Sequence, residues 1–105
     1  MLLTARERAA LKARAHPLEP VVQVGHAGLT PAVLAEIDRA LTSHQLIKIR
    51  LGGADRATRA TLASDICART DATEVQQVGR VLVLWRPNRD DAGGPAAVRP
   101  EDDED

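Results

Sequence analysis

Aromatic side chains are almost absent from this chain of 105 residues, which has no phenylalanine, no tyrosine and a single tryptophan, Trp85. Proteins that read unstacked bases do so by stacking them on exposed aromatic rings. The composition therefore excludes a base-stacking platform of that kind.

Cysteine is equally scarce, because Cys67 is the one thiol in the sequence. A single cysteine excludes an intramolecular disulfide and is typical of a reducing compartment. No apolar run approaches the ~20 residues that a membrane span requires. Met1-Leu2-Leu3 leads at once into charged residues rather than into the apolar region of a signal peptide. We expect one cytoplasmic domain with no membrane contact.

Motifs for catalysis, metals and cofactors are also missing. The three histidines and Cys67 do not have the spacing of metal ligands, and the glycines form neither a Walker-type loop nor a dinucleotide fingerprint. Cys67 lies on an apolar helical stripe with Leu62 and Ile66. A thiol in that position is more often buried packing than a nucleophile with a histidine base. We expect no enzyme activity, no metal and no cofactor.

Charge divides the chain into a basic body and an acidic tail. Residues 1–86 hold 12 Lys/Arg against 8 Asp/Glu, whereas residues 87–105 hold two arginines and seven acids and end in Glu101-Asp102-Asp103-Glu104-Asp105. The last segment is rich in proline and glycine and has almost nothing to bury, which predicts disorder. We expect a folded domain over 1–87 and a disordered acidic tail over 88–105.

Local signals predict three helices and four strands. Thr4-Ala5-Arg6-Glu7 has the spacing of a capping box and predicts a helix over 5–15. Thr30-Pro31 starts a helix over 31–43 with a hydroxyl cap and an N-terminal proline, and Asp55 can cap a third over 56–69. Strands are expected at 21–24, 46–51, 74–78 and 81–85. The order predicts a compact α/β domain (α+β, two-layer) with a four-stranded mixed sheet.

Two of these strands have distinct patterns of burial. Residues 46–51 alternate, with Ile47, Ile49 and Leu51 on one face and Lys48 and Arg50 on the other. That alternation predicts one buried and one solvated face. Residues 81–85 are apolar throughout, which is typical of a strand covered on both faces.

A Gly-x-x-Gly segment between the first strand and the second helix is the strongest functional signal. Glycine lets the backbone take positive φ and lets a ligand come close. The helix that follows adds unpaired N–H groups around Ala32 and Val33 and the positive end of its dipole, which favour phosphate. The segment is therefore a candidate nucleic-acid backbone clamp, formed by Gly25, His26, Ala27, Gly28 and Thr30. The alternative is an ordinary strand-to-helix turn.

Six basic side chains complete the candidate site: Arg8, Lys12, Arg14, Lys48, Arg56 and Arg59. Each of them alone is typical of a solvated surface. As a cluster they would supply the sequence-independent attraction for phosphates that makes binding sensitive to salt. The central His26-Ala27 pair carries no permanent charge, so the loop contacts would rest on backbone N–H groups and on the His26 imidazole.

These motifs together resemble the CRM domain, the RNA-binding fold of chloroplast splicing and ribosome maturation factors, and in particular its stand-alone bacterial YhbY-like form. The resemblance spans about 2–87 and rests on Leu11-Lys12, His16-Pro17-Leu18, Pro20-Val21-Val22, Gly25-x-x-Gly28-Leu29-Thr30 and Leu46-Ile47-Lys48. It implies a fold similar to the C-terminal domain of translation initiation factor three. It also implies a monomer that binds ribosomal RNA in large-subunit precursors and assists ribosome assembly.

Two alternatives remain open at this point. The domain can be a protein-interaction adaptor that docks on ribosomal proteins without touching RNA, in which case its basic face is incidental. The acidic tail can bind a basic ribosomal protein, or fold back on the face of Arg8 and Lys12 as an RNA mimic.

Overall fold

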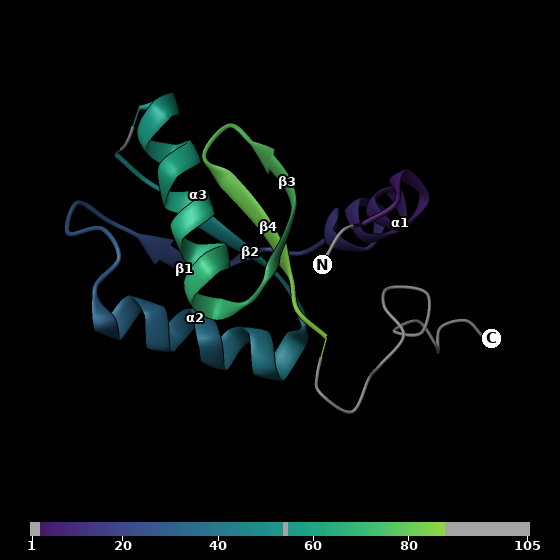
Figure 1. Ribbon diagram of the computed structural model, residues 1–105, viewed down its shortest axis with the longest axis horizontal. Coiled ribbons are helices and arrows are strands. Elements are labelled where there is room, and N and C mark those ends of the chain that lie inside the picture. Colours follow the sequence, from purple (N-terminus) through teal and green to yellow (C-terminus); the bar gives the residue numbers. More distant parts are fainter. Residues whose placement is uncertain (1–2, 54, 88–105) are drawn as a thin grey trace.

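The computed structural model describes residues 3–53 and 55–87, which form three helices and a four-stranded sheet (Figure 1). Each element lies within one or two residues of its predicted bounds. In chain order they are α1 (Ala5–Ala15), β1 (Pro20–Val24), α2 (Pro31–His44), β2 (Leu46–Leu51), α3 (Arg56–Thr70), β3 (Thr73–Val78) and β4 (Val81–Trp85).

Side-chain caps start all three helices where the sequence predicts them. Thr4 and Glu7 form the reciprocal capping box, with N···O distances of 2.9 and 3.0 Å. The Thr30 hydroxyl accepts from the Val33 N–H, and the Asp55 carboxylate accepts from the Thr58 N–H. Each cap satisfies one of the N–H groups that a helix leaves unpaired in its first turn.

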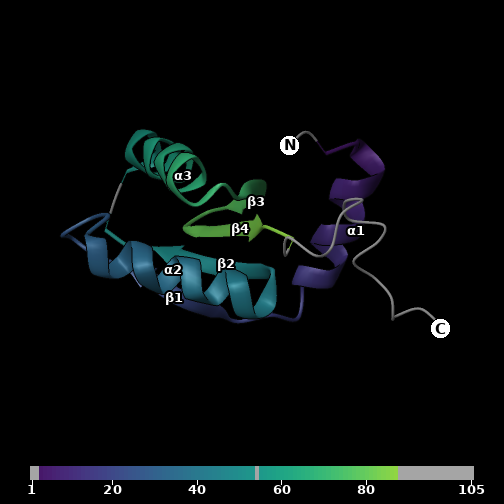
Figure 2. The ribbon, with the colours of Figure 1, turned by 60° about the horizontal axis from the view of Figure 1, so that its bottom comes forward.

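The strands lie in the order β1-β2-β4-β3, with β1 and β2 parallel and the other pairs antiparallel. This topology brings three connections to one end of the sheet: the β1–α2 loop, the β2–α3 loop and the β3–β4 turn. We call this the loop end; Figures 1 and 2 show the first two connections together at the left. A hydrogen bond from the Leu51 N–H to the Arg80 carbonyl joins β2 to the β3–β4 turn there.

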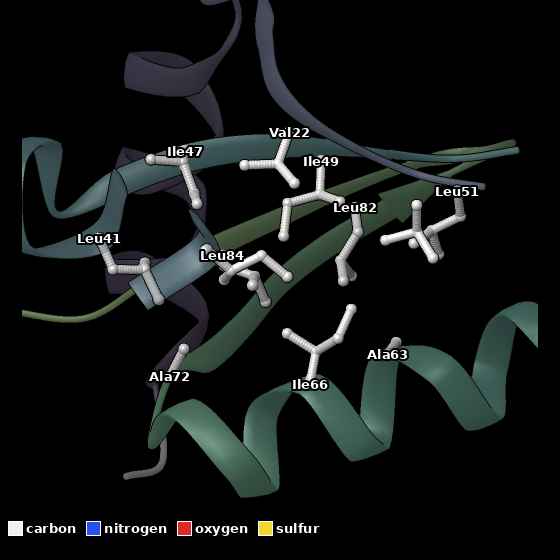
Figure 3. Close-up of a cluster of buried hydrophobic side chains, with 12 residues drawn as sticks. Val22, Leu41, Ile47, Ile49, Leu51, Ala63, Ile66, Ala72, Leu82 and Leu84 are labelled. Carbon is white, nitrogen blue, oxygen red and sulfur yellow. The ribbon is translucent and has the colours of Figure 1, made fainter. Parts of the chain in front are cut away.

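One face of the sheet is covered by α2 and α3 and holds the larger core (Figure 3). Ile66 of α3 points at Leu82, and Ile37 and Leu41 of α2 are fully buried in the same cluster. Ile47, Ile49 and Leu51 supply the β2 side chains, as the alternation predicts. Burial of aliphatic side chains of this size contributes about 1.5–3 kcal/mol each, so this face carries most of the hydrophobic stabilisation.

The other face is covered only at the end opposite the loops, by α1. Leu11 and Ala15 of α1 pack there on Leu46, Val83 and Trp85. β4 is thus buried from both sides over most of its length, as its apolar sequence predicts. The fold class is confirmed, and α1 adds a helix to the second face at that end.

No helix in the described ranges is long and apolar enough to cross a membrane. The acidic tail predicted at 88–105 lies outside the described residues, so its predicted disorder and both roles suggested for it stay predictions.

Candidate nucleic-acid interface

The Gly-x-x-Gly segment forms a tight turn at the loop end. The Gly28 N–H donates to the Gly25 carbonyl at 3.0 Å, and Gly28 has φ +75°, a conformation that favours glycine. The central residues His26 and Ala27 are exposed. Within the described part of the chain no hydrogen-bond partner is found for their backbone N–H groups. The turn therefore presents two adjacent backbone donors to solvent.

The N-terminus of α2 is less open than the sequence suggests. The Val33 N–H, predicted as a donor to a ligand, is taken by the Thr30 hydroxyl at 3.1 Å. Thr30 thus serves first as the cap of α2, although its hydroxyl proton can still be donated outward. Of the two donors predicted in this turn of the helix, the Ala32 N–H is the one left for a ligand.

His26 is positioned by the neighbouring β2–α3 loop. A Cβ on Gly53 would come 3.2 Å from His26 Cε1, and Gly53 itself has φ +73°. The Gly52 N–H donates to the Val24 carbonyl at 3.0 Å, which ties the two loops together at their base. Gly53 therefore supports the candidate site, because the absence of a side chain there makes room for the His26 imidazole of the first loop.

The first turn of α3 brings Arg56 and Arg59 to the same end. With Gln77 and Gly79 they line a surface hollow of about 390 Å³ between α3 and the β3–β4 turn. Asp55 caps this helix, and hydrogen bonds from Thr58 hold the pKa of its carboxyl below the ordinary value of 3.8. Five predicted residues of the turn and two predicted arginines thus share one end of the molecule.

The predicted residues on α1 lie at the opposite end of the sheet. Lys12 and Arg14 are exposed there. Arg8 also has a structural role that the sequence did not predict, because its Nη1 donates to the backbone carbonyls of Glu74 and Val75 at 2.8 and 2.6 Å. This partly buried guanidinium fastens α1 to the irregular part of β3 through its Nη1.

Lys48 lies on β2 between the two groups, and its Nζ is 3.3 Å from the His16 carbonyl oxygen. The structure thus divides the predicted basic residues into a loop-end pair, an α1 group and Lys48 between them.

Two further basic residues lie beside the predicted ones but were not included in the predicted site. Arg50 is exposed on the same face of β2 as Lys48, and Arg80 is exposed in the β3–β4 turn at the loop end. The alternation of residues 46–51 already placed Arg50 beside Lys48 and was the available signal. No local pattern signals Arg80, because its place beside β2 depends on strand order.

The structure offers no support for chemistry at Cys67. The thiol is half-buried against the core, and burial, with a smaller effect of Glu74, raises its pKa to about 11. A nucleophilic cysteine needs the opposite shift. Among the described residues there is also no group of three or more potential metal ligands.

Comparison with known proteins finds similarity over most of the chain. A profile of the CRS1/YhbY (CRM) domain matches residues 3–86. The chain is 46% identical to an "RNA-binding protein" of Haemophilus influenzae over 88 residues, which cover 84% of this chain and 89% of the relative. It is 40% identical to a "Probable RNA-binding protein" of Pseudomonas aeruginosa, covering 84% and 85% of the two chains.

A similar fold is found in the solution structure of a hypothetical protein from Staphylococcus aureus. The TM-score is 0.74 at 26% sequence identity, and the match covers 84% of this chain and 92% of the other.

Proposed function

Because the chain belongs to the CRS1/YhbY (CRM) domain family, we propose that it is a non-enzymatic RNA-binding protein that holds the RNA backbone at its loop end. The observation that carries the proposal is the Gly25–Gly28 turn, which exposes two adjacent backbone N–H groups, those of His26 and Ala27, with no partner among the described residues. Unpaired backbone donors in a glycine turn beside a helix N-terminus favour a phosphate. Relatives named as RNA-binding proteins support RNA as the ligand.

At the loop end, backbone N–H groups make the proposed contact with RNA and basic side chains strengthen it. The donors of the turn and the Ala32 N–H position a phosphate group, and Arg56 and Arg59 add attraction that does not depend on sequence. The arginines sit in the first turn of α3, where they oppose the helix dipole. A bound phosphate would relieve that local repulsion, so the arrangement costs less in the complex than in the free protein.

The ligand class follows from the family and from the composition. With Trp85 fully buried and no phenylalanine or tyrosine in the sequence, this chain exposes no large aromatic ring on which a base can stack. Folded RNA, recognised by its shape and its backbone, fits this surface better than an unstacked strand. We propose ribosomal RNA of large-subunit precursors as the target, and a role in ribosome assembly for a monomer acting in the cytoplasm.

A protein-interaction adaptor remains the second candidate, and one feature favours it. Leu18 and Val21 are exposed to 37% and 47% beside the edge strand β1. They line a hollow of about 340 Å³ together with Arg14, Glu19, His44, Leu46 and Ile47. A ribosomal protein docked there would not need the loop end.

The experiment is a salt titration of binding to fragments of large-subunit ribosomal RNA. Gly25→Asp places a carboxylate in the turn where nothing lies within 4 Å of a Cβ and φ is not positive. Gly25→Asn has the same shape without the charge and is its control. We expect Gly25→Asp to lose most of its affinity, Gly25→Asn to keep most of it, and wild-type affinity to fall steeply with salt.

A second pair of substitutions separates RNA from protein as the direct partner. Lys12→Ala/Arg56→Ala should flatten the salt dependence by roughly one unit of slope for each phosphate that the protein no longer neutralises. If wild type and all variants bind RNA equally weakly while circular dichroism shows each of them folded, RNA is not the direct ligand. Retention of a ribosomal-protein partner by the double variant would then establish the adaptor.

A further inference from the structure

The sheet face opposite α2 and α3 is left open between α1 and the loop end. Two rows of paired residues lie there. Gln23, Arg50, Val81 and Val78 are nearest the loops; in the row behind them Lys48 and Gln76 are partly exposed, whereas Val83 between them is buried against α1. Residues that pair directly across strands share a face. We call these two rows the open face. α1 covers Val83 and the third row, with Leu46 and Trp85.

The half of the open face that lies on β1 and β2 carries two cations, Arg50 and Lys48, against one acidic residue, Glu19, which lines a surface hollow with Gln23 and Arg50. Arg50 and Gln23 are exposed and pair directly across the strands, and Lys48 is the next residue along that face of β2. Within the described ranges neither Arg50 nor Gln23 has a hydrogen-bond or ion-pair partner for its side chain. The acidic side chains of α2 and α3 are on the other side of the sheet, where Asp38 is already paired with Arg86 at 2.7 Å.

Arg50, Lys48 and Gln23 lie between the two groups of predicted basic residues. Along β2, Arg50 and Lys48 are two residues, or about 7 Å, apart. From Leu46 beneath α1 to Leu51 at the loops the strand runs about 17 Å. Lys12 and Arg14 continue the positive charge past one end, and the Gly25–Gly28 turn lies past the other. Basic groups therefore follow the sheet from α1 to the loop end with β2 as their axis.

We infer that the open face is a second phosphate-binding surface, centred on Arg50 with Lys48 and Gln23, and that its ligand is a double-helical segment of RNA. The inference rests on the proposed function and extends the RNA-binding site from the clamp at the loop end to a surface that runs along β2. Arg50 and Lys48 each neutralise a backbone phosphate, and the Gln23 amide donates a hydrogen bond beside Arg50. A helix running along β2 then reaches the turn at one end and α1 at the other.

The chemistry of the surface favours a duplex over a single strand. A single strand bound along this face would need protein side chains on which its unpaired bases could stack. The open face offers Val78 and Val81 but no aromatic ring. A duplex has already stacked and paired its bases, and it offers a rigid series of phosphates and 2′-hydroxyls. Arginine, lysine and amide groups are the partners that such a backbone takes.

The test compares a labelled 20-base-pair RNA hairpin with an unstructured single strand that has the same number of nucleotides and therefore the same charge. Full-length Arg50→Gln is measured against Arg69→Gln, which removes the same charge from an exposed position on the last turn of α3. We expect Arg50→Gln to bind the hairpin roughly 3- to 10-fold more weakly and to lower the salt slope by about one. Arg69→Gln should match wild type, and wild type should prefer the hairpin.

Two results overturn the inference and leave the proposed function standing. The first is an Arg50→Gln affinity equal to wild type while Gly25→Asp loses binding, which would confine RNA to the loop end. The second is equal or tighter binding of the single strand, which would exclude a duplex as the ligand class. If wild type binds neither RNA, the proposed function fails as well.

Discussion

The imidazole of His26 lies against the backbone of Gly53, so that a Cβ added to Gly53 would come 3.2 Å from His26 Cε1. The two glycine-containing loops therefore do not act separately. The conformation of the predicted clamp depends on a residue that follows the next strand of the sheet.

Gly53→Ala tests this dependence. Its backbone has φ +73°, so alanine should cost about 1 kcal/mol of stability from strain alone, and the new methyl group should also displace His26. Gly79→Ala is the matched control, since Gly79 has φ +57° and nothing within 4 Å of its Cβ. Both variants should lower the midpoint of urea unfolding, and Gly53→Ala should weaken RNA binding more. Equal RNA affinity in the two would show that His26 needs no support from Gly53.

Arg8→Ala should act on folding more than on RNA. It removes two charge-assisted hydrogen bonds to the backbone carbonyls of Glu74 and Val75. A buried hydrogen bond to a charged group contributes about 1.5–3 kcal/mol to stability. The contribution is smaller at a partly exposed site such as this one. We expect a loss of about 1–2 kcal/mol in urea unfolding. Lys12→Ala, on the same helix and exposed, is the control and should leave stability nearly unchanged. A normal unfolding curve for Arg8→Ala would show that its two hydrogen bonds do not stabilise the fold.

Asp55 makes the stability of α3 depend on pH. Its pKa is lowered in the folded state by the hydrogen bonds from Thr58, so the stabilisation is complete above the ordinary value of 3.8 and is lost as pH falls through the lower folded value. The stability of wild type should exceed that of Asp55→Ala at pH 7, and the difference should shrink below about pH 4. Asp55→Asn keeps the cap without the charge. Thermal unfolding from pH 7 to pH 2.5 measures all three, and a constant difference would contradict the assignment.

Cys67 should react slowly with thiol reagents. A pKa raised from 9.0 to about 11 lowers the thiolate fraction roughly a hundredfold at pH 8. Alkylation by iodoacetamide at pH 8 should therefore be much slower than for a cysteine peptide, and it should approach the peptide rate in urea. Rapid alkylation of the folded protein would mean that the thiol is more exposed than the structure shows.

Sequence patterns predicted what depends on neighbours along the chain. The capping residues Thr4, Thr30 and Asp55 each act on a residue three positions away, so the starts of the helices could be read directly. The alternation in β2 predicted which of its side chains face the larger core. The mixed four-stranded sheet followed from the order of the elements together with the family resemblance.

Contacts between distant residues could not be read in that way. Arg8 was predicted to meet RNA, but its partners are carbonyls 66 and 67 residues away, at an irregularity in β3 that no local pattern shows. The place of α1 on the opposite face from α2 and α3, which separates Lys12 from Arg56, also depends on tertiary packing. Arg80 joins the loop end because β4 lies beside β2.

The alternation in β2 also bears on how this domain can change over evolutionary time. The proposed RNA contacts and the core occupy alternate codons of the same six-residue strand, with Lys48 and Arg50 on one face and Ile47, Ile49 and Leu51 on the other. Point mutations can therefore alter the ligand without touching the core. A one-codon insertion within the strand would move the residues that follow it to the opposite face of the sheet and so turn charged side chains toward the core. Homologous chains should accordingly vary at the outward positions by substitution, while the length of this strand stays constant.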